Sequence, residues 1–177
     1  EARARVLDAG AGPGMVGLAL AARVETCDVT GIEIDPVLVA LGNENARRSG
    51  LAERVRIIAG DVTAPLAALE AEGVRRESYD IVVSNPPFLE AEASQASPLP
   101  MQARASTMPE QGLARWARFY AAMARPDGVL YLIHRADQLR SILDALDGRF
   151  GGLVIFPLYP KVGAPAQEQA LASARHD

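Results

Sequence analysis

Short apolar runs alternate along this chain with longer segments of helical pattern. The apolar runs predict strands at residues 5–9, 28–34, 55–59, 79–84, 129–134 and 153–158. The segments between them predict helices at residues 14–23, 36–49, 65–72, 110–124 and 136–146. Alternation of this kind is typical of an α/β fold with a mostly parallel sheet and helices on both faces.

A single domain spanning residues 1–177 accounts for these elements, because no internal repeat or linker divides the chain. Both ends look unusual. The first predicted strand begins within a few residues of the N-terminus, and residues 164–177 are polar and rich in Ala and Gln where a last strand is expected. We therefore expect that the N-terminal segment and the last strand are missing or altered.

The segment Leu89–Pro109 is long for a loop inside a compact domain. Loops of this length usually carry a function or move. We expect this one to shape or cover the substrate pocket, because it follows the fourth predicted strand closely.

The composition favours an ordinary cytoplasmic α/β protein, with 49% hydrophobic and 5% aromatic residues. No apolar run approaches the roughly 20 residues that cross a bilayer, and no signal peptide opens the chain. We therefore expect no membrane partner. Cys27 is the single cysteine, which excludes an intrachain disulfide and a thiolate metal cluster and fits a reducing compartment.

The net charge of −4 provides no basic footprint for nucleic acid. Arginines gather in two groups, which we interpret mainly as solvated helix faces and loop edges. These groups are Arg47, Arg48, Arg54 and Arg56, and then Arg104, Arg115, Arg118 and Arg125. Charge alone neither supports nor excludes an RNA partner.

A glycine-rich loop follows the first predicted strand and contains Gly10, Gly12 and Gly14. Glycine adopts positive φ without strain and leaves no Cβ in the way of a ligand. The helix that follows directs its free N–H groups toward the loop, which favours a polar or anionic ligand end. Gly12, Gly14 and Gly17 also satisfy G-x-G-x-x-G, so a dinucleotide-binding oxidoreductase is an alternative.

Two carboxylates stand at the end of the second predicted strand. Glu33 could bind the ribose hydroxyls of a dinucleotide or of another nucleotide-like cofactor. Asp35 precedes Pro36 and is expected to cap the following helix.

The tetrapeptide Asn85-Pro86-Pro87-Phe88 closes the fourth predicted strand, where open α/β sheets bind ligands. The side-chain oxygen of Asn85 and the backbone oxygen of Pro86 could accept hydrogen bonds from a planar amine and fix the direction of its lone pair. The prolines restrict φ, and Phe88 could stack on a base. Nothing in this motif requires a metal.

Taken in order, four pieces of the chain resemble the class I S-adenosylmethionine-dependent methyltransferases, which have a Rossmann-like fold. They are Val6-Leu7-Asp8-Ala9-Gly10-Ala11-Gly12, Gly31-Ile32-Glu33-Ile34-Asp35, Gly60-Asp61-Val62 and Asn85-Pro86-Pro87-Phe88.

The resemblance implies S-adenosyl-L-methionine as the cofactor and assigns roles to the residues that hold it. Its methionine end would lie on the glycine loop, which Asp8 would order. Glu33 would bind the ribose diol, and Asp61 would accept a hydrogen bond from the adenine amine. Val62 and Ile34 would pack on the adenine ring.

More narrowly, the chain resembles the bacterial methyltransferases that modify adenine N6 beside the anticodon of a valine tRNA. Further matching stretches are Ala96-Ser97-Pro98, Gly112-Leu113, Leu132-Ile133-His134-Arg135 and Arg149-Phe150-Gly151-Gly152. The resemblance implies tRNA as the partner and N6-methylation as the activity.

Other functions remain open, because a protein glutamine amide offers the same planar NH₂ group to Asn85. A small-molecule O- or N-methyltransferase suits the acidic charge, and a cofactor-binding protein without catalysis would explain the unusual tail. Elsewhere in the chain, His134 is expected to be structural, and Trp116, Phe119 and Tyr120 are expected to face the core.

Overall fold

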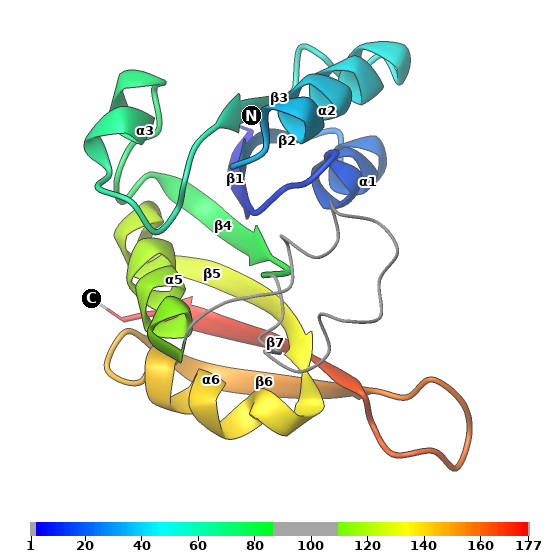
Figure 1. Cartoon of the computed structure of the whole chain (residues 1–177), viewed down its shortest axis with the longest axis vertical. Helices are drawn as coiled ribbons and strands as arrows, with labels where there is room; N and C mark the ends of the chain where they lie inside the picture. The colour runs from blue at the N-terminus through cyan, green and yellow to red at the C-terminus, as the bar shows by residue number, and fades with distance from the viewer. Residues whose placement is uncertain (1–2, 87–109, 177) are drawn as a thin grey trace.

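The computed structural model describes residues 3–86 and 110–176, without the side chains of residues 110 and 111. Within this part of the chain, seven strands form one sheet in the order β3-β2-β1-β4-β5-β7-β6 (Figure 1). The strands are β1 (Ala4–Ala9), β2 (Cys27–Glu33), β3 (Val55–Ala59), β4 (Tyr79–Ser84), β5 (Ala124–Arg135), β6 (Phe150–Leu158) and β7 (Glu168–Arg175). The strands β1 to β5 are parallel and β7 is antiparallel to both its neighbours, so the predicted mostly parallel α/β sheet is confirmed.

Helices flank the sheet and separate its strands along the chain. They are α1 (Met15–Arg23), α2 (Pro36–Arg48), α3 (Ala67–Ala71), α5 (Glu110–Met123), the short 3-10 helix η2 (Ala136–Gln138) and α6 (Leu139–Leu146). The helices α1 and α2 lie beside one another, and α5 lies beside α6 (Figure 1).

Two separate hydrophobic clusters show that the sheet is covered on both faces. Neighbouring residues of β1 point to opposite clusters, with Val6 in one and Leu7 in the other. The same division holds for Val83 and Val82 in β4. Because side chains alternate along a strand, β1, β2 and β4 each contribute buried residues to both clusters.

The larger cluster contains the aromatic residues of α5. Trp116, Phe119 and Tyr120 are each at most 6% exposed and belong to it. The prediction that they face the core is therefore confirmed.

The polar segment in which we expected the last strand to be missing or altered contains a regular strand, β7. Gln169, Leu171 and Ser173 are buried at every second position of this strand. The buried amide of Gln169 donates to the carbonyl oxygen of Arg135, and the hydroxyl of Ser173 donates to that of Gly151. The strand tolerates these polar side chains because the structure provides their hydrogen-bond partners.

The strand β5 begins earlier than the pattern predicts, directly after α5. Ala124 pairs with Tyr79, and regular pairing resumes where Val129 meets Ile81. Asp127, in between, has a φ of 60°. Residues 125–128, which lie between a predicted helix and a predicted strand, therefore form an irregularity inside β5 rather than a loop before it.

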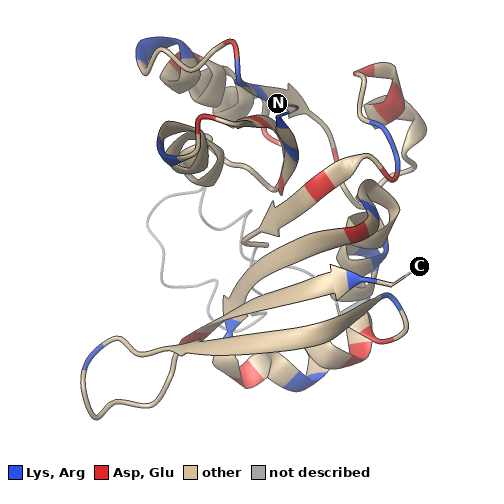
Figure 2. Cartoon of the chain, turned by 180° about the vertical axis from the view of Figure 1, so that it is seen from behind, with Lys and Arg blue, Asp and Glu red and all other residues tan. Residues whose placement is uncertain are grey.

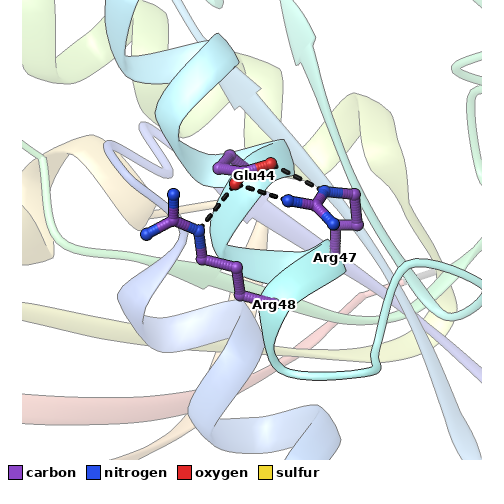
Figure 3. Close-up of polar contacts among 3 residues, drawn as sticks. All are labelled: Glu44, Arg47 and Arg48. Carbon is purple, nitrogen blue, oxygen red and sulfur yellow. Dashed lines mark hydrogen bonds and ion pairs between the residues drawn. The ribbon is translucent and has the colours of Figure 1, made fainter.

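Charged residues are dispersed over the molecule, as Figure 2 shows from behind. On the exposed face of α2, Glu44 receives hydrogen bonds from Arg47 and Arg48 (Figure 3). These bonds, those of Arg47 first, lower the pKa of Glu44 to about 2. Both guanidinium groups are more than half exposed, which agrees with the interpretation of this pair as a solvated helix face.

No helix in the described ranges is both long and apolar enough to cross a membrane.

Candidate active site

The strands β1, β2, β3 and β4 are parallel, so their carboxyl ends lie at one edge of the sheet. From β1 the sheet extends to β2 and β3 on one side, whereas β4 pairs with β1 on the other side. Open α/β sheets bind ligands at such a topological switch point. Ala9 and Ser84 are paired across it, and they directly precede Gly10 of the glycine loop and Asn85.

The glycine loop has the backbone conformation that the sequence predicts. Gly10, Gly12 and Gly14 have φ angles of 76°, 54° and 86°. These angles lie in the left-handed region, which glycine adopts most readily. A Cβ added at Gly12 would meet no atom of the described chain within 4 Å. The space beside Gly12 is therefore open to a ligand.

Asp8 ties the glycine loop to the start of α1. Its side chain is 2% exposed, and its Oδ2 accepts a hydrogen bond of 3.1 Å from the backbone N–H of Gly17. The N-cap residue of α1 is Gly14, which has no side chain to accept such a bond. Burial raises the pKa of Asp8 to about 6, against the Gly17 hydrogen bond, and the charge of Glu33 adds to the rise.

Glu33 joins the three loops that follow β1, β2 and β3. Its Oε2 accepts from the N–H of Gly12 at 2.8 Å, and its Oε1 accepts from the N–H of Asp35 at 2.9 Å. Its backbone carbonyl accepts from the N–H of Gly60 at 2.9 Å. Glu33 is 9% exposed, and its carboxylate contacts the backbone of the glycine loop at Gly12.

The loop after β3 presents one carboxylate and one apolar residue at the same edge. Asp61 accepts two hydrogen bonds of 2.7 Å on Oδ1, from the N–H and the hydroxyl of Thr63. Val62 is 7% exposed and belongs to the larger hydrophobic cluster. Ile34, which follows β2, is 67% exposed and so leaves an apolar surface at the edge.

Asn85 is exposed directly after β4, whereas the following Pro86 is buried. The described chain therefore presents an exposed Asn85 next to a buried Pro86 at the switch point. The other predicted residues of this motif, Pro87 and Phe88, lie outside the described residues, as does the segment Leu89–Pro109. Their roles remain predictions.

Three residues that sequence reasoning did not assign to the site lie at its base. The hydroxyl of Ser84 donates to the carbonyl oxygen of Ala9 at 2.8 Å, and the phenol of Tyr120 donates to Ser84 Oγ at 2.9 Å. Burial raises the pKa of Tyr120, so its hydroxyl stays protonated. A Cβ added at Gly10 would lie 2.9 Å from the ring of Trp116. The pattern alone indicated only that the two aromatic residues are buried.

His134 is buried near the carboxyl end of β5, and its Nδ1 accepts from the N–H of Arg135 at 2.9 Å. Burial lowers the pKa of His134. This local contact agrees with the structural role expected for it. Asp35 Oδ1 likewise accepts from the N–H of Val37 and caps α2, which confirms the predicted capping role.

Comparison with known proteins identifies the family. The family model for the methyltransferase small domain matches residues 1–106. The tRNA1(Val) (adenine(37)-N6)-methyltransferase of Porphyromonas gingivalis is 33% identical over 137 residues, which cover 77% of this chain and 51% of the relative. The release factor glutamine methyltransferase of Moorella thermoacetica is 31% identical over 146 residues, which cover 78% of this chain and 48% of the relative.

Among solved structures, a protein of Agrobacterium tumefaciens described as a predicted O-methyltransferase superposes with a TM-score of 0.78. It is 25% identical, and the match covers 98% of this chain and 74% of the other. The fold is therefore the Rossmann-like fold of class I methyltransferases. The chain spans about half the length of the two curated relatives that it matches.

The chain belongs to the methyltransferase small domain family. The class of protein is that of the S-adenosylmethionine-dependent methyltransferases, as predicted. The geometry fits this cofactor, because the Glu33 carboxylate is hydrogen-bonded to the glycine loop and a Cβ at Gly12 would meet no atom of the described chain within 4 Å.

Proposed function

We propose that the protein transfers a methyl group from S-adenosylmethionine to the exocyclic N6 of an adenine in tRNA. The observation that carries the proposal is the exposed Asn85 on the buried Pro86, directly after the strand that pairs with β1. In this proposal Asn85 would serve as an uncharged hydrogen-bond acceptor close to the glycine loop, because the residues before each of them are paired.

The cofactor would lie across the ends of β1, β2 and β3. Gly10, Gly12 and Gly14 would form the floor under its methionine end. Glu33 would accept hydrogen bonds from the ribose diol. Asp61 would accept one from the adenine amine, because both its bonds within the described chain fall on Oδ1. Ile34, with its exposed side chain, would cover one face of the adenine ring.

The residues after β4 would prepare the acceptor nitrogen. An exocyclic amine is a weak nucleophile because its lone pair is delocalised into the ring. The Asn85 side-chain oxygen and the Pro86 carbonyl would accept the two amine hydrogens and turn the lone pair toward the methyl group. Bound S-adenosylmethionine supplies that methyl group on an activated sulfonium. The nitrogen would gain the methyl as the methyl–sulfur bond breaks to leave a neutral thioether, and it would release one proton to water. The protein therefore mainly has to position the reactants.

The choice of tRNA rests on the relatives and on the narrower sequence resemblance. The name of the Porphyromonas gingivalis relative specifies adenine N6 in a valine tRNA. The proposal places the protein in the cytoplasm, where tRNA is found. The net charge of −4 gives no independent support for RNA.

A second candidate function is methylation of a glutamine side chain in a protein. It is favoured by the Moorella thermoacetica relative, whose name specifies a release factor. A glutamine amide and an adenine amine are both planar NH₂ groups, so Asn85 and Pro86 would serve either substrate.

The test is transfer of labelled methyl from S-adenosylmethionine to total tRNA from a bacterial strain lacking this activity, followed by nucleoside analysis. The wild-type protein should form N6-methyladenosine. Asn85→Ala should lower the rate by about 100-fold or more, because the amine loses a positioned acceptor.

Cofactor affinity separates a chemical defect from a folding defect in this experiment. Asn85→Ala should bind S-adenosylmethionine as tightly as the wild type, since Asn85 is exposed and lies outside the glycine loop. Label in a release factor peptide and none in RNA would establish the second candidate. Label in neither, with the cofactor bound, would reject both.

A further inference from the structure

A single serine hydroxyl connects the two halves of the site. Ser84 Oγ donates its one proton to the carbonyl oxygen of Ala9, the residue before Gly10. Ser84 also immediately precedes Asn85. This bond of 2.8 Å therefore links the last residue before the cofactor loop to the last residue before the acceptor motif.

Helix α5 completes this connection. The phenol of Tyr120, which is 0% exposed, donates to Ser84 Oγ and so directs the serine proton toward Ala9. One turn earlier on the same helix, the ring of Trp116 lies against Gly10. The two rings meet edge to face, with centroids 6.0 Å apart and planes 64° apart.

We propose that Ser84 and Tyr120 are positioning residues that set the separation between the acceptor amide and the methyl donor. The inference rests on the proposed function. The two strand ends are already paired by backbone contacts, and the hydroxyls add a contact at the last residue of each strand. Displacement of a reactive group by even 1 Å can cost on the order of 100-fold in rate.

A second tyrosine shows that this core buries a phenol without giving it a partner. Tyr79, at the other end of β4, is 1% exposed, and its hydroxyl has no hydrogen-bond partner within the described structure. Tyr79→Phe is therefore a matched control for Tyr120→Phe, because both changes remove one buried oxygen at one end of the same strand.

The experiment measures methyl transfer by Tyr120→Phe, Ser84→Ala, Ser84→Thr and Tyr79→Phe on whichever substrate the wild type methylates. Rates are normalised to cofactor sites titrated in each preparation, so that unfolded protein does not count. We expect Tyr120→Phe and Ser84→Ala to lower kcat by about tenfold or more, with KM for substrate and cofactor changed by less than about twofold. Ser84→Thr keeps a hydroxyl and should restore most of kcat, and Tyr79→Phe should match the wild type.

Each possible result supports or overturns the positioning role of Ser84 and Tyr120. A kcat in Tyr120→Phe equal to that of Tyr79→Phe, with active wild type, would overturn the positioning role and leave the proposed function intact. Equal losses in kcat and in cofactor affinity would also overturn it, because they would indicate a general structural role. A wild-type protein that binds cofactor but methylates neither tRNA nor a release factor peptide would reject the proposed function and this inference with it.

Discussion

The two halves of the carboxyl edge use different polar groups. The cofactor half, at the ends of β1, β2 and β3, carries the carboxylates of Asp8, Glu33 and Asp61. Glu33 and Asp61 accept backbone N–H groups from the loops around them, and Asp8 accepts one from the first turn of α1. Asp8 and Glu33 are almost completely buried.

The acceptor half, at the end of β4, is built from neutral groups. Its polar side chains are the hydroxyls of Ser84 and Tyr120 and the amide of Asn85. None of these three side chains carries a charge at neutral pH.

The difference fits the two chemical tasks that we propose. Carboxylates suit a ligand that presents ribose hydroxyls and amines, and they also organise the loops that hold it. A neutral amide can accept from a neutral amine without drawing in water or cations. The following predictions test whether the carboxylates lie in the cofactor half because cofactor binding requires them there.

The largest expected effect is on the pH dependence of the free energy of unfolding, and it comes from the titration of Asp8. Its pKa is about 6 in the folded protein and near the ordinary 3.8 in the unfolded chain. Between these values the folded state keeps a proton that the unfolded state has lost. The contribution of Asp8 to the free energy of unfolding is therefore greatest below about pH 4 and falls, by about 3 kcal/mol at most, as the pH rises through 6.

Urea denaturation of the wild type and Asp8→Asn at pH values from 4 to 7 measures this contribution. The wild type should lose stability relative to the variant as the pH rises. The neutral acceptor half provides the control, because Asn85→Ala should follow the wild-type profile. Parallel curves for the wild type and Asp8→Asn would show that the buried carboxyl does not titrate in this range.

An intermediate effect, a loss of about 2 kcal/mol in the free energy of cofactor binding, is expected when the Glu33 carboxylate is removed. Removal of its carboxylate in Glu33→Ala should weaken S-adenosylmethionine binding between about tenfold and 100-fold, since hydrogen bonds to a charged group are lost. Asp35→Ala is the matched control. It removes the cap of α2 and about 1 kcal/mol of stability, but should leave cofactor affinity unchanged.

Calorimetric titration of the cofactor distinguishes these variants. Unchanged affinity in Glu33→Ala would contradict the proposal that Glu33 binds the ribose diol. It would also contradict the view that the carboxylates of the cofactor half serve cofactor binding.

The smallest effect on stability is expected for a methyl group added to the glycine loop. Gly12 has a φ of 54° and Gly50 one of 68°, and neither would bring a Cβ within 4 Å of the described chain. Gly12→Ala and Gly50→Ala should therefore each cost about 1 kcal/mol of stability through backbone strain. Only Gly12→Ala should weaken cofactor binding, because only its methyl enters the proposed ligand space. Equal affinities in the two variants would place the cofactor elsewhere.

Most of the fold could be predicted from local pattern, because buried parallel strands are short and apolar and helices separate them. The strand β7 could not be recognised in this way, since alanines occupy one face and Gln169 and Ser173 are buried on the other. Its polar side chains become acceptable only beside the carbonyls of Arg135 and Gly151, which come from other strands.

The candidate site shows the same limit. Glycines with positive φ, a carboxylate at a strand end and the Asn85 motif each have a local cause, so the sequence could indicate them. The bond between Tyr120 and Ser84 joins residues 36 positions apart and depends on how α5 packs on β4. No spacing along the chain could predict it.

The place of β7 also has a consequence for how the protein is made. Among the described strands β6 pairs only with β7, which lies between β5 and β6. During synthesis, β6 leaves the ribosome before the strand that attaches it to the sheet. At about 5–20 residues per second, the interval from residue 158 to residue 175 lasts about 1–3 s. For that time the backbone N–H and C=O groups of β6 lack the strand with which they pair in the folded protein, so β6 stays an unpaired strand until β7 is complete.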